Sequence, residues 1–358
     1  MPQTNYSFNP NLTDQRVGDR QLMLQSMIEA INNEAFRHKS ILITGATGFV
    51  GRNLIKELVK SDIYRNNALK IICATRSPQK LFEQWPDELS KLQFLNWDVR
   101  QPLTERLPNI DYIFHLAGEN RTVGNEEKSK LISETSILGA KNLLEAIKNS
   151  DVKKIIFASS GAVYKNTQGM TQAFDESNEI INFESAKSDP YRAGKVHAES
   201  ILKDFYKKSN TQILIARMFT FVGPYLPLDS NYAIGNFIND CILNKPITVK
   251  SNGRSIRSYQ FSTDMVNWLI TILLFGRNGE SYNIGSAEQI TIKNLANRVA
   301  EVFENKYGVK ILGDQTPDPV SSFYVPKIEK AKSELGLSNY FSLDNSLLEM
   351  RRLLINSD

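Results

Sequence analysis

The sequence predicts an α/β fold in which a doubly wound parallel sheet is followed by a smaller mixed α/β lobe. Three observations support this. A short apolar run ends in a glycine-rich segment that leads directly into a helical pattern, over residues 40–60. Apolar runs typical of strands then alternate with helical segments as far as Arg217, which is typical of a parallel sheet covered on both faces. Beyond about Gly223, prolines separate shorter elements, so the architecture is expected to change there.

The expected elements follow in order along the chain. After the first strand, further strands are expected at Leu69–Ala74, Gln93–Asn96, Asp111–Leu116, Lys154–Ser159 and Gln212–Arg217. Helices are expected at Asn53–Lys60, Leu138–Asn149 and Ala193–Lys208. Beyond Gly223, short strands at Ile247–Val249 and Ser281–Ile284 bracket an apolar helix at Met265–Phe275. Apolar residues between Gln21 and Phe36 recur close to a helical spacing, which predicts a helix docked on the domain or on a partner subunit.

Composition excludes several classes of protein. The chain has 358 residues, of which 41% are hydrophobic, enough for one large core and a smaller lobe. Cys73 and Cys241 lie apart, which argues for a reducing compartment and against a disulfide or metal framework. No apolar run approaches the roughly 18–20 residues of a spanning helix, and the polar N-terminus shows no secretory signal. We therefore expect a cytoplasmic protein without a membrane partner. The charge of +4 is small and scattered, so nucleic acid is not an expected partner.

The glycine-rich segment Thr44–Gly51 predicts a dinucleotide site. Three glycines spaced three apart stand between a strand and a helix, which is the context in which such a motif binds a pyrophosphate. Gly45 permits the tight turn, Gly48 lets the backbone approach the pyrophosphate, and Gly51 lets the helix pack on the strand. The helix N-terminus offers N–H groups and a partial positive charge to the phosphates. The sequence therefore predicts an N-terminal extension over 1–38, a dinucleotide-binding Rossmann domain over 39–222, and a smaller lobe over 223–358, some of whose elements return to the first domain.

The motifs resemble those of the short-chain dehydrogenase/reductase superfamily, in its extended branch that modifies nucleotide sugars. The segment T-G-A-T-G-F-V-G, Ser160, and the run from Tyr191 to Lys195 carry the resemblance, because the last two look like the family's Ser plus Y-x-x-x-K catalytic set. It extends from about residue 39 to about 338. The resemblance implies that the Rossmann domain over 39–222 binds NAD(P) and that the lobe over 223–358 mainly binds the substrate, a nucleotide-diphosphate sugar. It also implies a homodimer built on two helices per subunit, for which Leu138–Asn149 and Ala193–Lys208 are the candidates.

The expected chemistry rests on Tyr191, Lys195 and Ser160. A phenol has a reference pKa near 10, too high for a base at neutral pH. Lys195 lies one helical turn from Tyr191 on the same face, and its positive charge favours the phenolate. Tyr191 would take the proton of a sugar hydroxyl while hydride leaves the same carbon, or protonate a ketone as hydride arrives. Lys195 would also hold the ribose, and Ser160 would hydrogen-bond the reacting oxygen.

Cofactor choice is expected to depend on Arg76. NAD sites usually have an acid at the end of the second strand, and NADP sites tolerate a basic residue there. Here Thr75-Arg76-Ser77 ends the strand, and no acid follows until Glu83. Arg76 would either bind the 2′-phosphate of NADP or stack on the adenine of NAD. We favour NADP. The resemblance adds residues beside the adenine and under the ribose and nicotinamide.

The expected cofactor-binding set is Gly45, Thr47, Gly48, Phe49, Val50, Gly51, Arg76, Asp98, Val99, Leu116, Ala117, Gly118, Ser159, Tyr191 and Lys195. His115 lies within an apolar strand and is expected in the core.

The residues after Ser160 narrow the reaction. In 4,6-dehydratases and decarboxylases of the family, one of the next two positions is commonly acidic, and here Gly161 and Ala162 follow. The resemblance therefore favours a 4-epimerase with tightly held NAD or a 4-ketoreductase with exchanging NADPH. The alternatives are a 4,6-dehydratase or decarboxylase with a base from elsewhere, and a non-catalytic NAD(P)-binding regulator.

The resemblance also implies substrate contacts at Ser160, Thr220, Asn236 and Arg257. Arg257 lies in a segment like the family's G-x-x-x-R-x-Y/F run, whose arginine binds the pyrophosphate, and a planar guanidinium suits phosphate oxygens. Thr220 departs from the pattern, because an asparagine often contacts the substrate there. Ser136 and Lys165 also stand where the family usually has asparagine and glycine.

Overall fold

The computed structural model describes residue 22 and residues 35–79, 91–119, 126–165, 172–230, 232–313 and 322–355. The helix expected between Gln21 and Phe36 lies almost wholly outside these residues. Within them, every helix is too short or too polar to cross a bilayer.

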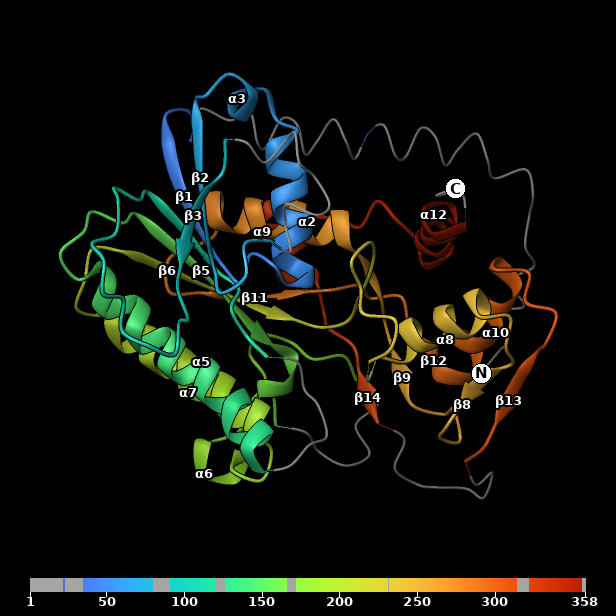
Figure 1. Cartoon of the computed structure of the whole chain (residues 1–358). Helices are drawn as coiled ribbons and strands as arrows, with labels where there is room; N and C mark the ends of the chain where they lie inside the picture. The colour runs from blue at the N-terminus through green and yellow to red at the C-terminus, as the bar shows by residue number, and fades with distance from the viewer. Residues whose placement is uncertain are drawn as a thin grey trace.

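A parallel sheet forms the centre of the larger part of the molecule (Figure 1). Among the described residues it has seven strands in the order β11-β6-β5-β4-β1-β2-β3, and all neighbours pair in parallel. The strand order reverses at β1, so the carboxyl ends of β1 and β4 flank the crevice where such sheets bind ligands. The predicted fold class is therefore confirmed. The strands are β1 (Lys39–Thr44), β2 (Leu69–Thr75), β3 (Gln93–Asn96), β4 (Tyr112–His115), β5 (Lys154–Ser160), β6 (Gln212–Met218) and β11 (Ser281–Ile284).

Helices cover both faces of the sheet because successive strand side chains point to opposite sides. Ile41 and Ile43 of β1 join one core with α2 (Phe49–Val59) and α9 (Ser262–Phe275). Leu42 joins a second core on the opposite face with α5 (Glu126–Ile147) and α7 (Pro190–Tyr206). α5 begins before the predicted Leu138, since its polar first turns lack the apolar spacing that identifies a helix.

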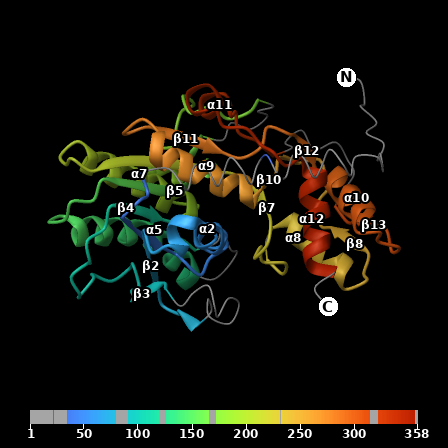
Figure 2. The same cartoon turned by 90° about the horizontal axis from the view of Figure 1, so that it is seen from above.

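A smaller lobe lies beside the sheet in both views (Figures 1 and 2). Its core is a third apolar cluster that includes Phe237, Leu295 and Leu347. α9 and β11, although they come from the C-terminal part of the chain, belong to the sheet layers. The lobe and its connections contain β7 (Phe221–Val222), α8 (Ala233–Ile242), β8 (Ile247–Val249), β9 (Ile256–Arg257), β10 (Gln260–Phe261), β12 (Ile290–Thr291), α10 (Ile292–Val302), β13 (Val309–Ile311), β14 (Phe323–Tyr324) and α12 (Leu343–Ile355).

Short elements complete the larger part of the molecule. A single 3-10 turn (Gly161–Val163) follows β5, the short helix α3 (Asp62–Arg65) precedes β2, and α6 (Phe183–Ala186) precedes α7. The helix α11 (Glu329–Leu335) lies against the edge strand β11.

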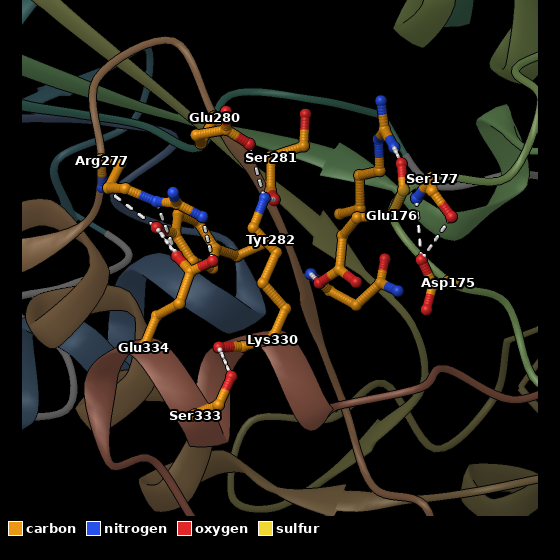
Figure 3. A network of polar contacts seen from close by, with 12 residues as sticks. Asp175, Glu176, Ser177, Arg277, Glu280, Ser281, Tyr282, Lys330, Ser333 and Glu334 are labelled. Carbon is orange, nitrogen blue, oxygen red and sulfur yellow. Dashed lines mark hydrogen bonds and ion pairs between the residues drawn. The ribbon is translucent and has the colours of Figure 1, made fainter.

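Polar contacts fasten α11 to that edge strand (Figure 3). The Tyr282 hydroxyl donates to Glu334 Oε2 over 2.9 Å, and Arg277 also pairs with Glu334. Lys330 Nζ binds Glu280 Oε2 over 2.6 Å. These contacts hold α11 against β11, the edge strand of the sheet.

Candidate active site

The glycine-rich turn has the geometry that a dinucleotide pyrophosphate requires. Gly45 has φ +69°, and a Cβ there would stand 2.8 Å from the backbone of Leu116 and Ala117. A Cβ on Gly51 would stand 2.8 Å from Ala46 Cα, so this glycine lets α2 approach β1. α2 begins after Gly48 with no side-chain cap and no acidic residue in its first turn. This bare, N–H-rich helix end suits a phosphate group.

A cleft of about 1450 Å³ runs from this turn to the lobe. Its volume exceeds that of a site for one small ligand and leaves room for a dinucleotide and a second nucleotide. Of the predicted substrate residues, Thr220, Asn236 and Arg257 also line it, whereas Ser160 does not. The whole predicted cofactor set lines it: Gly45, Thr47, Gly48, Phe49, Val50, Gly51, Arg76, Asp98, Val99, Leu116, Ala117, Gly118, Ser159, Tyr191 and Lys195.

The first turns of α7 place Tyr191 and Lys195 at the cleft. Asp189 caps the helix by accepting from the Arg192 N–H over 3.3 Å, and Pro190 occupies the first position, where proline is tolerated. Lys195 Nζ lies 6.0 Å from the centre of the Tyr191 ring and donates to the Ala158 carbonyl over 2.7 Å. Burial lowers the pKa of Lys195 to about 8, against the opposing effect of the Glu199 carboxylate. Lys195 and Tyr191 therefore lie near each other at the cleft.

Ser160 is buried and directly follows Ser159, which lines the cleft. It is 4% exposed, and its Oγ accepts from the Ala162 N–H over 3.2 Å. The Tyr324 hydroxyl lies 3.3 Å from the same Oγ. Sequence reasoning did not identify Tyr324, because β14 is only two residues long and carries no motif.

Gly161 faces the ring of Phe219. A Cβ at Gly161 would lie 2.5–2.7 Å from three atoms of that ring, which is closer than such atoms approach. The Phe219 ring is also packed on Tyr324, with ring centres 4.7 Å apart. Position 161 therefore has no room for a side chain while Phe219 occupies this place.

Arg76 follows β2, and charged residues that follow β3 and β4 surround it. Its guanidinium lies 3.4 Å from Glu119 Oε1 and 3.8 Å from Asp98 Oδ2, and the side chain is 54% exposed. The main partner of Asp98 is Arg100, whose Nε donates to Asp98 Oδ1 over 2.9 Å. Hydrogen bonding from the Arg100 side chain is the main reason why the pKa of Asp98 is lowered. Glu119 and Arg100 were missed in the sequence, although both follow strands whose ends meet at this crevice.

The predicted substrate residues differ in what holds them. The Thr220 hydroxyl donates to the Ser258 carbonyl, so it is tied to the backbone. Arg257 Nη1 donates to the Ser322 carbonyl over 2.9 Å and Nη2 to Ser322 Oγ over 3.1 Å. Asn236 lines the cleft from α8.

Three further positions bear on the sequence analysis. His115 is fully buried, with Nδ1 2.8 Å from Thr44 Oγ1, and burial lowers its pKa to about 3, so the expectation of a core histidine is confirmed. Ser136 is buried where α5 and α7 meet, and a Cβ on Gly194 would lie 3.2 Å from it. Tyr225, which was missed, lines the cleft with φ +68° and faces the Arg52 guanidinium, 5.8 Å from its ring centre.

The fold and the site together define a dinucleotide-binding oxidoreductase of the short-chain dehydrogenase/reductase type. The model of the NAD-dependent epimerase/dehydratase family matches residues 41–285. The chain belongs to this family, which confirms the resemblance found in its motifs. It is an NAD(P)-dependent enzyme of the extended branch.

Relatives and solved structures agree on the family and differ in the reaction. The chain is 26% identical to UDP-glucuronic acid decarboxylase 6 of Arabidopsis thaliana over 298 residues, which cover 83% of each chain. It is 28% identical to dTDP-D-glucose 4,6-dehydratase of Dictyostelium discoideum over 276 residues, 74% of this chain and 62% of that one. UDP-glucuronic acid 4-epimerase of Bacillus cereus, solved with UDP-glucuronic acid and NAD, superposes with a TM-score of 0.74 at 25% identity, covering 88% of this chain and 99% of the other.

Proposed function

We propose that the protein transfers hydride between NAD(P) and the C4 carbon of a nucleotide-diphosphate sugar, as a 4-epimerase or a 4-ketoreductase. The observation that carries this proposal is the placement of Tyr191 and Lys195 together at a cleft that also contains every expected cofactor residue. When bound, the nicotinamide supplies the hydride acceptor or donor. Tyr191 exchanges the proton of the C4 oxygen, Lys195 favours its phenolate, and Thr220, Asn236 and Arg257 line the substrate end.

The contact between Gly161 and Phe219 favours these two reactions over dehydration or decarboxylation. Both alternatives need a group that acts after the oxidation step, and the resemblance placed such an acid at one of the two positions after the catalytic serine. At Gly161 the Phe219 ring occupies the space of a side chain, and Ala162 is buried and carries no carboxyl group. Neither position therefore supplies the acid. The Phe219 ring leaves no room for a side chain at 161, and residue 162 is an alanine.

The setting of Arg76 favours NADP as the cofactor. Its contacts with Glu119 and Asp98 are long and half exposed, and such pairs contribute at most about 1 kcal/mol. A 2′-phosphate forms shorter, charge-assisted bonds with a guanidinium and would replace them. The alternative is that Arg76 stacks on the adenine of NAD, which is the dinucleotide bound in the solved 4-epimerase.

A substrate panel tests the proposal. The purified protein is incubated with UDP-, dTDP- and GDP-hexoses and their 4-keto forms, with NAD or NADPH, and products are identified by NMR. We expect a change of configuration or oxidation state at C4, and loss of this turnover in Tyr191→Phe. Binding of the dinucleotide with no turnover of any sugar, and an unchanged biological role in Tyr191→Phe, would instead indicate a regulator. Release of water or carbon dioxide would indicate the dehydratase or decarboxylase.

We also propose a homodimer in which α5 and α7 of each subunit form the contact. The two helices pack against each other on one face of the sheet (Figure 1). Light scattering coupled to size exclusion tests this, with a mass of two chains expected and a mass of one chain contradicting it.

A further inference from the structure

A tyrosine of the lobe lies beside Ser160, the last residue of β5. Tyr324 Oη lies 3.3 Å from Ser160 Oγ, although the two residues are 164 positions apart. The same hydroxyl donates to the Met218 carbonyl over 3.4 Å. A phenol has one proton to donate, so in this arrangement Ser160 is the donor to Tyr324. The two distances are nearly equal, and a rotation of the Tyr324 hydroxyl alone redirects its proton to Ser160.

The surroundings of Tyr324 hold its ring in one place. It packs on Phe219 with ring centres 4.7 Å apart. The next residues are fixed as well, because Phe174 N–H donates to the Val325 carbonyl over 2.9 Å and Lys327 N–H donates to the Phe174 carbonyl over 2.7 Å. The Tyr324 hydroxyl can therefore rotate while its oxygen stays beside Ser160.

The strand that carries Tyr324 also holds Arg257. β14 pairs in parallel with β9, and Tyr324 stands opposite Arg257 in the register. The guanidinium lies 5.9 Å from the centre of the Tyr324 ring and binds Ser322 at the start of the same segment. Arg257, the residue expected at the diphosphate, therefore lies in the same strand pair as Tyr324.

We propose that Tyr324 is a positioning residue for Ser160, and that it connects the arginine expected at the diphosphate to the serine expected at the reacting oxygen. The inference rests on the proposed function. With a sugar in place, the Tyr324 proton turns from Met218 to Ser160, and the Ser160 proton turns to the C4 oxygen. Tyr324 acts only through Ser160 and touches no reacting atom. No bond other than hydrogen bonds changes in this step.

Kinetics of Tyr324→Phe test the proposal, because this variant keeps the ring and removes only the hydroxyl. With a sugar that the parent protein turns over, we expect kcat to fall about tenfold, the size expected for one lost hydrogen bond in the transition state. We expect KM to stay within about twofold. Ser160→Ala/Tyr324→Phe is expected to be no slower than Ser160→Ala. Tyr307→Phe, which removes an exposed hydroxyl of the lobe, serves as the matched control and keeps the parent kcat. An unchanged kcat in Tyr324→Phe, or losses that multiply in the double variant, would overturn the proposal.

A measurement without substrate separates this inference from the proposed function. If the parent turns over no sugar of the panel, the proposed function fails, and the contact is then tested by thermal unfolding of the two single variants and the double variant. A combined loss of Tm smaller than the sum of the single losses supports the link between Tyr324 and Ser160. Strictly additive losses contradict it.

Discussion

Arg217 and Glu199 form a buried, two-pronged ion pair beneath the carboxyl end of β5. Arg217 Nε lies 3.1 Å from Glu199 Oε1 and Nη2 lies 2.9 Å from Oε2, with both side chains at most 3% exposed. Ser159 Oγ donates to the same carboxylate over 2.5 Å. Because Glu199 lies one turn after Lys195 on α7, the pair holds α7 against β5 and β6.

Removing one partner of this pair is expected to destabilise the protein strongly. Glu199→Ala leaves the Arg217 charge buried without its carboxylate, which costs about 3–5 kcal/mol of unfolding free energy. Urea unfolding at neutral pH measures the loss. Glu184→Ala removes an exposed glutamate that pairs with Lys187 and is the control, with a change below about 1 kcal/mol. A loss as small in Glu199→Ala would show that the pair does not hold α7 in place.

Gly161→Ala is expected to disturb the site through Phe219. The new methyl group would meet the ring at 2.5–2.7 Å, and such overpacking costs about 1–3 kcal/mol. A smaller residue opposite it relieves the clash, so Gly161→Ala/Phe219→Leu should recover part of the lost unfolding free energy. Calorimetry of the four proteins gives the coupling. If Gly161→Ala is as stable as the parent, the steric argument against an acid at this position fails.

Arg76→Ala is expected to separate the two cofactors. Loss of a charge-assisted contact to a 2′-phosphate weakens NADPH binding by about 10- to 100-fold, whereas NADH binding changes by about twofold or less. Isothermal titration with both dinucleotides measures the effect, and Arg106→Ala, an exposed arginine outside the cleft, is the control. Equal losses for both dinucleotides would place Arg76 against the adenine instead.

The buried Lys195 is expected to give the protein a pH-dependent stability. Its folded pKa of about 8 lies below the ordinary value near 10.4, so the unfolded chain binds more protons between these values. The unfolding free energy therefore rises with pH in this window. The destabilisation caused by burying the charged Lys195 is fully present below about pH 8. Relative to Lys195→Met, the parent should gain about 2 kcal/mol between about pH 7 and pH 10.

Urea unfolding across this pH range checks the prediction for Lys195. Lys207→Met, an exposed lysine at the end of the same helix, is the control and should run parallel to the parent. A difference between parent and Lys195→Met that does not change with pH would contradict the lowered pKa.

The sequence predicts those parts of the site that depend on local patterns. Gly45, Gly48 and Gly51 lie in one turn between a strand and a helix, and Tyr191 and Lys195 share one helical face, so spacing alone places them. The ends of parallel strands meet at one edge, which places Arg76 and Asp98 at the same crevice. All these residues line one cleft.

The rest of the site depends on contacts between distant segments. Tyr324 reaches Ser160 from a two-residue strand of the lobe, and Phe219, which directly follows β6, fills the space beside Gly161. Neither contact leaves a regular residue spacing in the sequence by which it could be predicted. Thr220 was expected to contact the substrate, and only the structure shows that its hydroxyl is bound to the Ser258 carbonyl.

The most direct test of the central claim follows hydride between the nicotinamide and C4 of the sugar. The protein is given a 4-keto nucleotide sugar and a reduced dinucleotide labelled with deuterium at the transferable position, and the product is examined by NMR and mass spectrometry. We predict deuterium at C4 of the sugar, in one epimer for a ketoreductase and in both for an epimerase, and none with Tyr191→Phe. A product with no label at C4, or labelled C4 product formed equally well by Tyr191→Phe, would contradict the account.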